Sequence, residues 1–332
     1  MTKRYFLGID VGGSKTHALI VDDSGQALGF ASAGPGNWEA VGYDGLTNVL
    51  LNITSRILKM TNVSMEHIAG VGMGIAGYDW PCQRQAHLDA IHPLNIQAPI
   101  KFVNDVILGI LAGSEEGWGI SVVAGTGCNC RGWSKDHQRE GRVVGGAGYW
   151  SGEAAGGFDL VARAMRQVTY AWAKRGPATA LSQALIQHTG AKDLDDLIEG
   201  VYLNRYGFDL SMVLLVFQVA EQGDSQALEV IRWAGEELGQ MVCSVVNQLS
   251  LHNESFDVVM IGSLFDGHPL LTESLRETVH KVAPQARLVR LSVPPVVGAV
   301  LLGMEAANVD FINKRERLIR STNELLNQQN KV

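Results

Sequence analysis

Residues 5–21 read Tyr5-Phe6-Leu7-Gly8-Ile9-Asp10-Val11-Gly12-Gly13-Ser14-Lys15-Thr16-His17-Ala18-Leu19-Ile20-Val21. Two apolar runs flank a turn that contains Gly12 and Gly13, and Asp10 stands near the end of the first run. Apolar runs separated by paired glycines are typical of a β-hairpin. Because Asp23-Ser24-Gly25 predicts another turn, residues 26–33 are expected to add a third strand to an antiparallel meander.

Beyond this meander, the predicted elements alternate between helix and strand. Apolar residues at helical spacing predict a helix that begins at about Asp44. Asp224 is a good N-cap for a long helix in a mostly helical middle region, residues 153–252. Further strands are expected over residues 68–75, 100–103, 256–261 and 287–291, and further helices over residues 81–91, 104–115 and 311–328. This alternation favours an α/β fold.

The opening pattern recurs once. Residues 119–127 read Gly119-Ile120-Ser121-Val122-Val123-Ala124-Gly125-Thr126-Gly127, again a strand followed by a glycine turn, and residues 128–133 are expected to form the returning strand. The repeat suggests two domains of related plan, with the second beginning near residue 117.

The composition is that of a folded protein with a sizeable core. Of 332 residues, 46% are hydrophobic and 18% are charged, a length that suggests two domains. The net charge of −7 argues against a nucleic-acid partner. No run of 18 apolar residues is present, so no membrane span is expected, and Met1–Tyr5 does not introduce a signal peptide. Four cysteines make no disulfide framework, so a cytoplasmic location is the default expectation.

Glycine is enriched, with 38 residues clustered between apolar runs. Such clusters are typical of turns where the backbone approaches a phosphate or a sugar. Three of them follow strands: Gly12-Gly13-Ser14-Lys15-Thr16, Gly125-Thr126-Gly127 and Gly262-Ser263. The first two are candidate phosphate loops, the third a candidate adenosine loop, and Asp10 a candidate carboxylate for hydrated Mg²⁺. An ordinary Gly-Gly hairpin is the alternative for the first turn, which is not a Walker A loop.

Asn104-Asp105 ends the strand predicted at residues 100–103. A carboxylate there is a candidate general base that takes the proton of a substrate hydroxyl as it attacks phosphorus. The structural alternative is that Asp105 caps the following helix.

Two segments combine glycine turns with polar and aromatic side chains suited to a polyhydroxylated ligand. The first contains Asn37 and Trp38, and the second, residues 145–153, contains Gly148 and Glu153. A turn with a core tryptophan and an irregular surface loop are the respective alternatives.

Two other patterns in the sequence have a structural alternative that is favoured. Gly72-Met73-Gly74-Ile75-Ala76-Gly77 matches the dinucleotide fingerprint, but Asp105 follows Gly77 by 28 residues and an antiparallel meander precedes it, which disfavours that reading. Cys128 and Cys130 share one face of a predicted strand, where simple burial is favoured over a metal pair.

Taken in order, these residues resemble the N-acetylglucosamine kinase branch of the BadF/BadG/BcrA/BcrD ATPase family, within the actin/hexokinase/heat-shock chaperone superfamily. The resemblance runs from about Phe6 to Met304. Its most specific segments are residues 8–16, Asn104-Asp105, residues 123–131 and residues 294–300.

The resemblance implies two ribonuclease-H-like, actin-like ATPase domains with a cleft between them. The expected domains are residues 1–116, with helices 296–332 packed on them, and residues 117–295 with a helical insertion. It also implies ATP and Mg²⁺ as cofactors, Asp105 as the catalytic base, Asp10 near Mg²⁺, and a homodimer. The positions implied to bind sugar are Asn37, Trp38, Asp105, Thr126, Asn129, Gly148 and Glu153.

The chain departs from the family at Gly152-Glu153-Ala154-Ala155-Gly156, where the family has Gly-Asp-Glu-Gly-Ser. The longer Glu153 side chain and the lost second acid bear on which sugar is accepted. The expected activity is phosphorylation of an amino sugar, with N-acetylglucosamine at its 6-hydroxyl foremost and glucosamine or another hexosamine as alternatives. An ATPase that activates a dehydratase or reductase through an iron–sulfur cluster, and a catalytically silent sugar or nucleotide sensor, are the competing interpretations.

Overall fold

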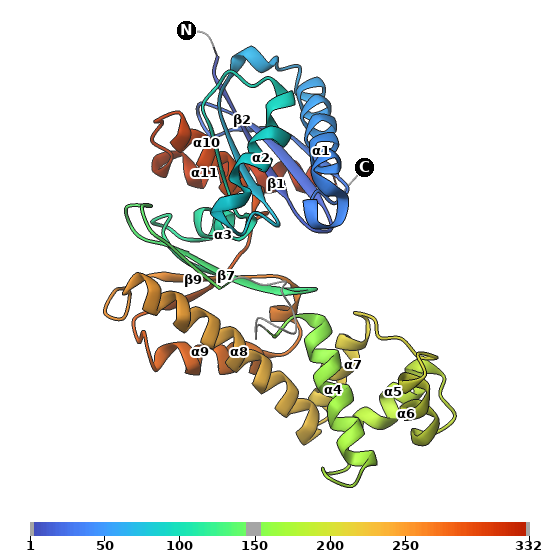
Figure 1. Cartoon of the computed structure of the whole chain (residues 1–332). Coiled ribbons are helices and arrows are strands. Elements are labelled where there is room, and N and C mark those ends of the chain that lie inside the picture. Colours follow the sequence, from blue (N-terminus) through green and yellow to red (C-terminus); the bar gives the residue numbers. More distant parts are fainter. Residues whose placement is uncertain (1–2, 144–153, 330–332) are drawn as a thin grey trace. The chain divides into compact units, whose positions relative to one another are not determined.

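The computed structural model describes residues 3–143 and 154–329 (Figure 1). Gly148 and Glu153 therefore lie outside the described residues. The chain divides into two compact units, each treated by itself below. Unit 1 comprises Met1–Gly119, Trp133–Gln138 and Val289–Val332, and unit 2 comprises Ile120–Gly132 and Arg139–Leu288.

Unit 1 is built on a five-stranded sheet with the order β3-β2-β1-β4-β5. The strands are β1 (Tyr5–Val11), β2 (Thr16–Asp22), β3 (Ala27–Ala33), β4 (Ile68–Ile75) and β5 (Ile100–Val103). The predicted antiparallel meander of β1, β2 and β3 is confirmed, and β4 and β5 add parallel strands on the other side of β1. The register places Asp10 between His17 of β2 and Gly74 of β4.

Helices cover both faces of this sheet. One core joins the sheet to α1 (Trp38–Thr61) and α2 (Arg84–Ile91), and the other joins it to α3 (Asp105–Gly113), α10 (Val296–Ala306) and α11 (Ile312–Gln329). Helix α10 approaches the sheet very closely, since a Cβ atom at Gly72 would lie 2.0 Å from the carbonyl oxygen of Ala299. Glycine at Gly72 therefore permits the contact between α10 and β4. Short 3₁₀ turns lie at Met65–His67, Pro81–Gln83 and His92–Leu94.

Helix α1 begins earlier than the expected Asp44. Its N-cap is Asn37, whose side-chain oxygen accepts a hydrogen bond from the amide of Glu39 at 3.0 Å. Gly42 then adopts φ +71° inside the helix. This kink interrupts the apolar periodicity, which explains why the sequence pattern identifies only the part of α1 beyond it.

Unit 2 repeats the sheet plan. Its order is β10-β9-β6-β7-β8, which matches the order in unit 1 when β6 is paired with β1, β7 with β2, β8 with β3, β9 with β4 and β10 with β5. The strands are β6 (Gly119–Ala124), β7 (Cys128–Trp133), β8 (Glu140–Val143), β9 (Asp257–Ile261) and β10 (Arg287–Arg290). The repeated strand–turn–strand pattern in the sequence thus corresponds to a repeated fold, although β8 carries no clear strand pattern.

The remaining helices belong to unit 2 (Figure 1). They are α4 (Gly157–Trp172), α5 (Leu181–Thr189), α6 (Leu194–Tyr202), α7 (Met212–Glu221), α8 (Ser225–Leu249) and α9 (Pro269–His280), with a 3₁₀ turn at Ser263–Asp266. Asp224 caps α8 as predicted, because its carboxylate accepts hydrogen bonds from the amides of Gln226 and Ala227. Among the described residues, no helix is long and apolar enough to cross a membrane.

Candidate active site

The carboxyl ends of three parallel strands meet at one edge of the sheet in unit 1. Asp10 lies near the end of β1, Gly77–Asp79 follows β4, and Asn104-Asp105 follows β5. In open α/β sheets, ligands bind at the carboxyl ends of parallel strands. This edge is therefore the candidate active site of unit 1.

Asp10 is the acid at this edge whose pKa is shifted furthest from its usual value. Its side chain is 14% exposed, and its carboxylate lies 3.9 Å from Nδ1 of His17. Burial, together with the negative charge of Asp105, raises the pKa of Asp10 to about 8. Two acidic groups that oppose each other's ionisation form a site that a bound cation would stabilise. Within the described residues there is no cluster of three or more His, Cys, Asp or Glu side chains that could hold a metal ion.

Asn104, and not Asp105, caps helix α3. The Oδ1 atom of Asn104 accepts a hydrogen bond from the amide of Val106 at 3.1 Å, and Asp105 is the first residue of the helix. The alternative that Asp105 serves as the N-cap is therefore wrong. Asp105 is half-buried, and the fixed start of α3 holds its backbone at the carboxyl end of β5.

The glycine turn after β1 exposes three of its residues. The amide of Gly12 donates to the carbonyl of Lys15 at 2.9 Å and closes the turn. Gly13, Ser14 and Lys15 are exposed, and the space beside Gly13 is open to 4 Å. Thr16, by contrast, is fully buried. Residues 13–15 therefore form the part of the predicted phosphate loop that an anion can reach.

Asn37 and Trp38 both have structural partners. Besides capping α1, Asn37 donates from Nδ2 to the carboxylate of Glu39 at 3.1 Å. The indole of Trp38 donates to the carbonyl oxygen of Gly77 at 2.7 Å and stacks on Tyr43 with the ring centroids 4.8 Å apart. The half-buried Asn37 and Trp38 therefore stand next to the loop that follows β4, at the edge where Asp10 and Asp105 lie.

In unit 2 three glycine segments converge on the hairpin between β6 and β7. The Gly125 amide donates to Gly127 O at 2.9 Å, and the amide of Gly157, at the start of α4, donates to Gly125 O at 2.8 Å. A Cβ atom at Gly262, which has φ +105°, would lie 2.1 Å from the carbonyl oxygen of Ala124. The predicted second phosphate loop and the predicted adenosine loop are thus in direct backbone contact.

The exposed surface of this hairpin carries the remaining predicted site residues of unit 2. Thr126, Gly127 and Ser263 are exposed. Asn129 is half-buried, and its Oδ1 atom has no hydrogen-bond partner among the described residues. An amide oxygen without a protein partner is available to a polar ligand.

Taken unit by unit, the residues present fit parts of a magnesium–nucleotide group. An exposed turn with Lys15 offers backbone amides and a positive charge to phosphate. The pair Asp10 and Asp105 offers a hydrated cation the carboxylate oxygens that it prefers. Open space beside Gly125 and Gly127 leaves room at the second turn, where a side chain would otherwise intrude.

The two disfavoured sequence patterns have structural explanations. Gly72 and Gly74 lie inside β4, so they make no dinucleotide-binding turn. Cys130 is buried and Cys128 is half-buried on β7. Gly77 and Asp79, which contact Trp38 and Asn104 at this edge, are not among the residues predicted from the sequence, although their position soon after a predicted strand is a usable signal.

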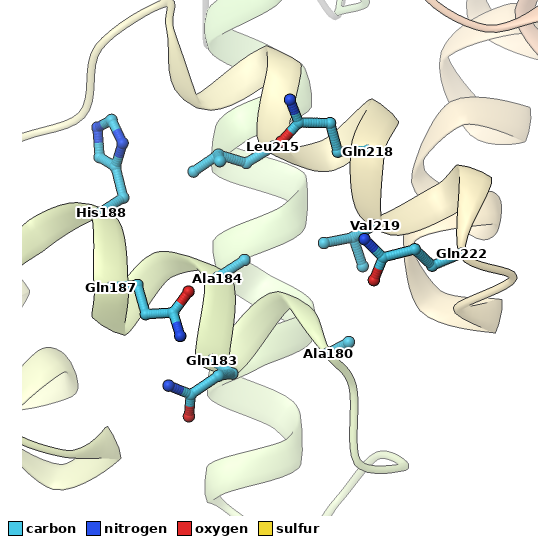
Figure 2. A pocket seen from close by; sticks show the side chains of 9 residues that line it. All are labelled: Ala180, Gln183, Ala184, Gln187, His188, Leu215, Gln218, Val219 and Gln222. Carbon is cyan, nitrogen blue, oxygen red and sulfur yellow. The ribbon is translucent and has the colours of Figure 1, made fainter.

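A separate hollow of about 470 Å³ lies on the helical part of unit 2, between α5 and α7 (Figure 2). Its walls include Gln183, Gln187, Gln218 and Gln222, and its one titratable lining residue, His188, pairs with Asp209 at 3.3 Å. It contains none of the predicted site residues and no carboxylate among its lining residues. The hollow therefore lacks a carboxylate that could serve as the base for phosphoryl transfer.

Comparison with known proteins identifies relatives of this chain. A curated relative, the N-acetylmuramic acid/N-acetylglucosamine kinase of Clostridium acetobutylicum, is 27% identical over 305 residues, which cover 90% of this chain and 98% of the relative. The N-acetyl-D-glucosamine kinase of Dictyostelium discoideum is 26% identical over 325 residues, covering 92% and 99% of the two chains.

A solved structure, that of a provisionally assigned N-acetylglucosamine kinase of Chromobacterium violaceum, superposes with a TM-score of 0.64 at 23% identity. It covers 90% of this chain and 98% of its own, and the likeness supports the predicted α/β fold of two ribonuclease-H-like domains. The BadF/BadG/BcrA/BcrD ATPase family model matches residues 7–303. The resemblance inferred from the sequence is confirmed, and the chain belongs to the BadF/BadG/BcrA/BcrD ATPase family.

Proposed function

We propose that this protein is an ATP-dependent amino-sugar kinase that phosphorylates the 6-hydroxyl of N-acetylglucosamine. Its membership of an ATPase family and the names of its two curated relatives support this activity. The reaction forms a bond between the sugar oxygen and the γ-phosphorus of ATP, breaks the bond from that phosphorus to the β–γ bridging oxygen, and yields ADP and the sugar phosphate.

The observation that carries the proposal is the position of Asp105 beside Asp10 at the carboxyl edge of the sheet in unit 1. Phosphoryl transfer to an alcohol requires alignment of the hydroxyl and a group that takes its proton. Asp105 accepts that proton. Because Asn104 supplies the helix cap, the Asp105 carboxylate is not needed to cap α3.

Around this base, the other residues divide by ligand. Asp10 would hold Mg²⁺, through water, and the bound ion would supply positive charge that neutralises the phosphates. In the first phosphate loop, Gly12–Thr16, the exposed residues Gly13, Ser14 and Lys15 are assigned to direct phosphate contact, while Gly12 closes the turn and the buried Thr16 ends it. Gly125, Thr126 and Gly127 are assigned to phosphate from the second turn, and Gly262 and Ser263 to adenosine. Asn37, Trp38, Thr126 and Asn129 are assigned to sugar, as are Gly148 and Glu153 from the sequence alone.

The two curated relatives are named for different sets of acceptors. One relative is named for N-acetylmuramic acid as well as N-acetylglucosamine, so both sugars belong in any test. Glucosamine and N-acetylmannosamine lack, respectively, the acetyl group and the 2-configuration that an N-acetylglucosamine site would read. We further propose that the enzyme acts as a homodimer in the cytoplasm, which size-exclusion chromatography with light scattering and cell fractionation test.

The direct experiment is an ADP-coupled assay of the whole protein with Mg²⁺ and ATP across these four sugars, glucose and a no-sugar control. We expect turnover to be highest with N-acetylglucosamine. Asp105→Asn should lower kcat by about 10²–10⁴-fold, whereas Asp89→Asn on α2, where the exposed carboxylate contacts Gln85, should leave kcat unchanged. ADP production independent of every sugar would instead favour the activator-ATPase interpretation, and nucleotide or sugar binding without turnover would favour the sensor.

A further inference from the structure

The loop that follows β4 contacts both predicted parts of the acceptor site. This bridging loop consists of Gly77, Tyr78 and Asp79. At its beginning, the carbonyl of Gly77 accepts the Trp38 indole hydrogen bond at 2.7 Å. Gly77 has φ +81°, and a Cβ atom there would lie 2.4 Å from Oδ1 of Asn37. The start of the bridging loop is therefore held tightly against the start of α1.

The end of the bridging loop is held against the start of α3. Nδ2 of Asn104 donates to the carbonyl of Tyr78 at 3.2 Å and to the carboxylate of Asp79 at 3.1 Å. Since Oδ1 of Asn104 accepts from Val106, both the nitrogen and the oxygen of this amide side chain are engaged in hydrogen bonds. Asn104 is 2% exposed, so these bonds are not in competition with bulk water.

The backbone of Asp79 is fixed as well. Oε1 of Gln83 accepts hydrogen bonds from the amides of Asp79 and Trp80, each at 2.8 Å. Asp79 thus presents its carboxylate to Asn104 from a loop that is itself anchored. A chain of contacts runs from Asp79 through Asn104 to the first turn of α3, which carries Asp105.

We propose that Asp79 is a positioning residue that acts through Asn104 to fix where Asp105 leaves the sheet edge relative to Asn37. This inference rests on the proposed function, because it assigns Asp105 as the base and Asn37 to the sugar. Reacting groups must be held within a fraction of an ångström of their productive arrangement, and a displacement of about 1 Å costs about 10²-fold in rate. The hydrogen bond from Asn104 requires an acceptor at position 79 and does not require a negative charge.

Two substitutions separate these properties. Asp79→Ala removes the acceptor, and we expect kcat to fall about 10–100-fold, with KM for ATP changed less than twofold. Asp79→Asn keeps an oxygen acceptor, and we expect it to restore kcat to within about threefold of the parent enzyme. Asp89→Ala, which removes an exposed carboxylate on α2, is the matched control and should leave both constants unchanged.

Hydrogen–deuterium exchange gives a readout that does not depend on turnover. In Asp79→Ala the peptide spanning residues 103–108 should exchange faster than in the parent, while a peptide from α8 should not change. Asn104→Ser keeps a capping oxygen but removes the amide group that donates to Tyr78 and Asp79, so it should produce the same local effect. If Asp79→Ala unfolds, kcat and hydrogen–deuterium exchange of Asp79→Asn and Asn104→Ser still test the proposal.

The proposal is overturned if Asp79→Ala retains full kcat, or if Asp79→Asn loses as much activity as Asp79→Ala, because the carboxylate would then act on substrate or metal directly. If the parent protein phosphorylates none of the sugars tested, the proposed function fails. The exchange data then still test the coupling of Asp79 to the start of α3, and unchanged exchange over residues 103–108 would reject it.

Discussion

The Asp10 carboxyl lies largely buried beside Asp105, and this burial together with the negative charge of Asp105 raises the pKa of Asp10 to about 8. Gly74 of β4 adjoins both residues, because Asp10 is in register with Gly74 and a Cβ atom at Gly74 would lie 3.0 Å from the Cα atom of Asp105. An acid that is protonated near neutral pH until a cation arrives couples proton release to metal binding.

The first prediction concerns stability and pH in the absence of ligands. The folded-state pKa of Asp10 lies above its usual value of 3.8. Its contribution to the free energy of unfolding is therefore fully present below pH 4 and is lost as the pH rises towards 8. Asp10→Asn removes that loss. We expect the variant to gain stability relative to the parent between pH 4 and 8, reaching on the order of a few kcal/mol.

Urea unfolding at pH 5 and pH 8 measures this difference. Asp23→Asn, a substitution in the turn between β2 and β3, serves as the control and should shift both curves equally. A stability difference between Asp10→Asn and the parent that does not grow with pH would contradict the raised pKa.

The second prediction concerns the metal. Below pH 8, binding of Mg²⁺ with ATP should release up to one proton from Asp10 in the parent, because the cation favours the ionised carboxylate. Calorimetric titration in two buffers of different ionisation enthalpy measures the release, and Asp10→Asn should abolish it. Excess chelator should also stop turnover; activity that survives chelation would remove Asp10 from the metal site.

A third prediction separates capping from catalysis at the start of α3. Asn104→Ala removes the cap and both bonds to the bridging loop, so it should destabilise the fold by about 1–2 kcal/mol. Asp105→Ala leaves the cap in place and should lower the melting temperature less than Asn104→Ala does, while it lowers kcat more. Thermal unfolding and steady-state kinetics on the same samples test the order; the reverse order in kcat would argue against Asp105 as the base.

The fourth prediction concerns Asn37, which caps α1 besides being a candidate sugar ligand. Asn37→Ala should cost about 1 kcal/mol in stability through the lost cap. Asn37→Ser keeps a capping oxygen, so its effect reports the sugar contact: KM for N-acetylglucosamine should rise at least fivefold more than KM for ATP. Equal changes in the two KM values would mean that Asn37 has only its capping role.

The fifth prediction concerns the close contact between Gly74 and the first turns of α3. A Cβ atom at Gly74 would lie 2.3 Å from Cδ1 of Leu108 and 3.0 Å from the Cα atom of Asp105. Gly74→Ala should therefore shift the start of α3, costing about 1–3 kcal/mol and lowering kcat per folded molecule. Gly207→Ala is the control, since nothing lies within 4 Å of its Cβ position. Unchanged kcat in a folded Gly74→Ala enzyme would show that the site tolerates this shift.

Local patterns in the sequence predicted most elements that position the site. Strands β4 and β5 occupy the predicted residues 68–75 and 100–103, and Asp224 caps α8 as expected. Helix α1 was placed too late because the Gly42 kink breaks its periodicity, and β8 was missed because its four residues contain no alternating apolar pattern. A kink and a short edge strand depend on contacts outside the segment itself.

The sequence alone determined that Asp10 and Asn104-Asp105 lie at the ends of strands. It also determined that a glycine turn follows the first strand of each repeat, because apolar periodicity and glycine-containing turns are local properties. Tertiary structure decided which residues act on one another. Trp38 contacts Gly77 across 39 positions, and Asn104 contacts Asp79 across 25. The parallel register of β1, β4 and β5 creates these contacts by bringing three distant chain segments to one edge. Burial at that edge, which no local pattern encodes, raises the pKa of Asp10.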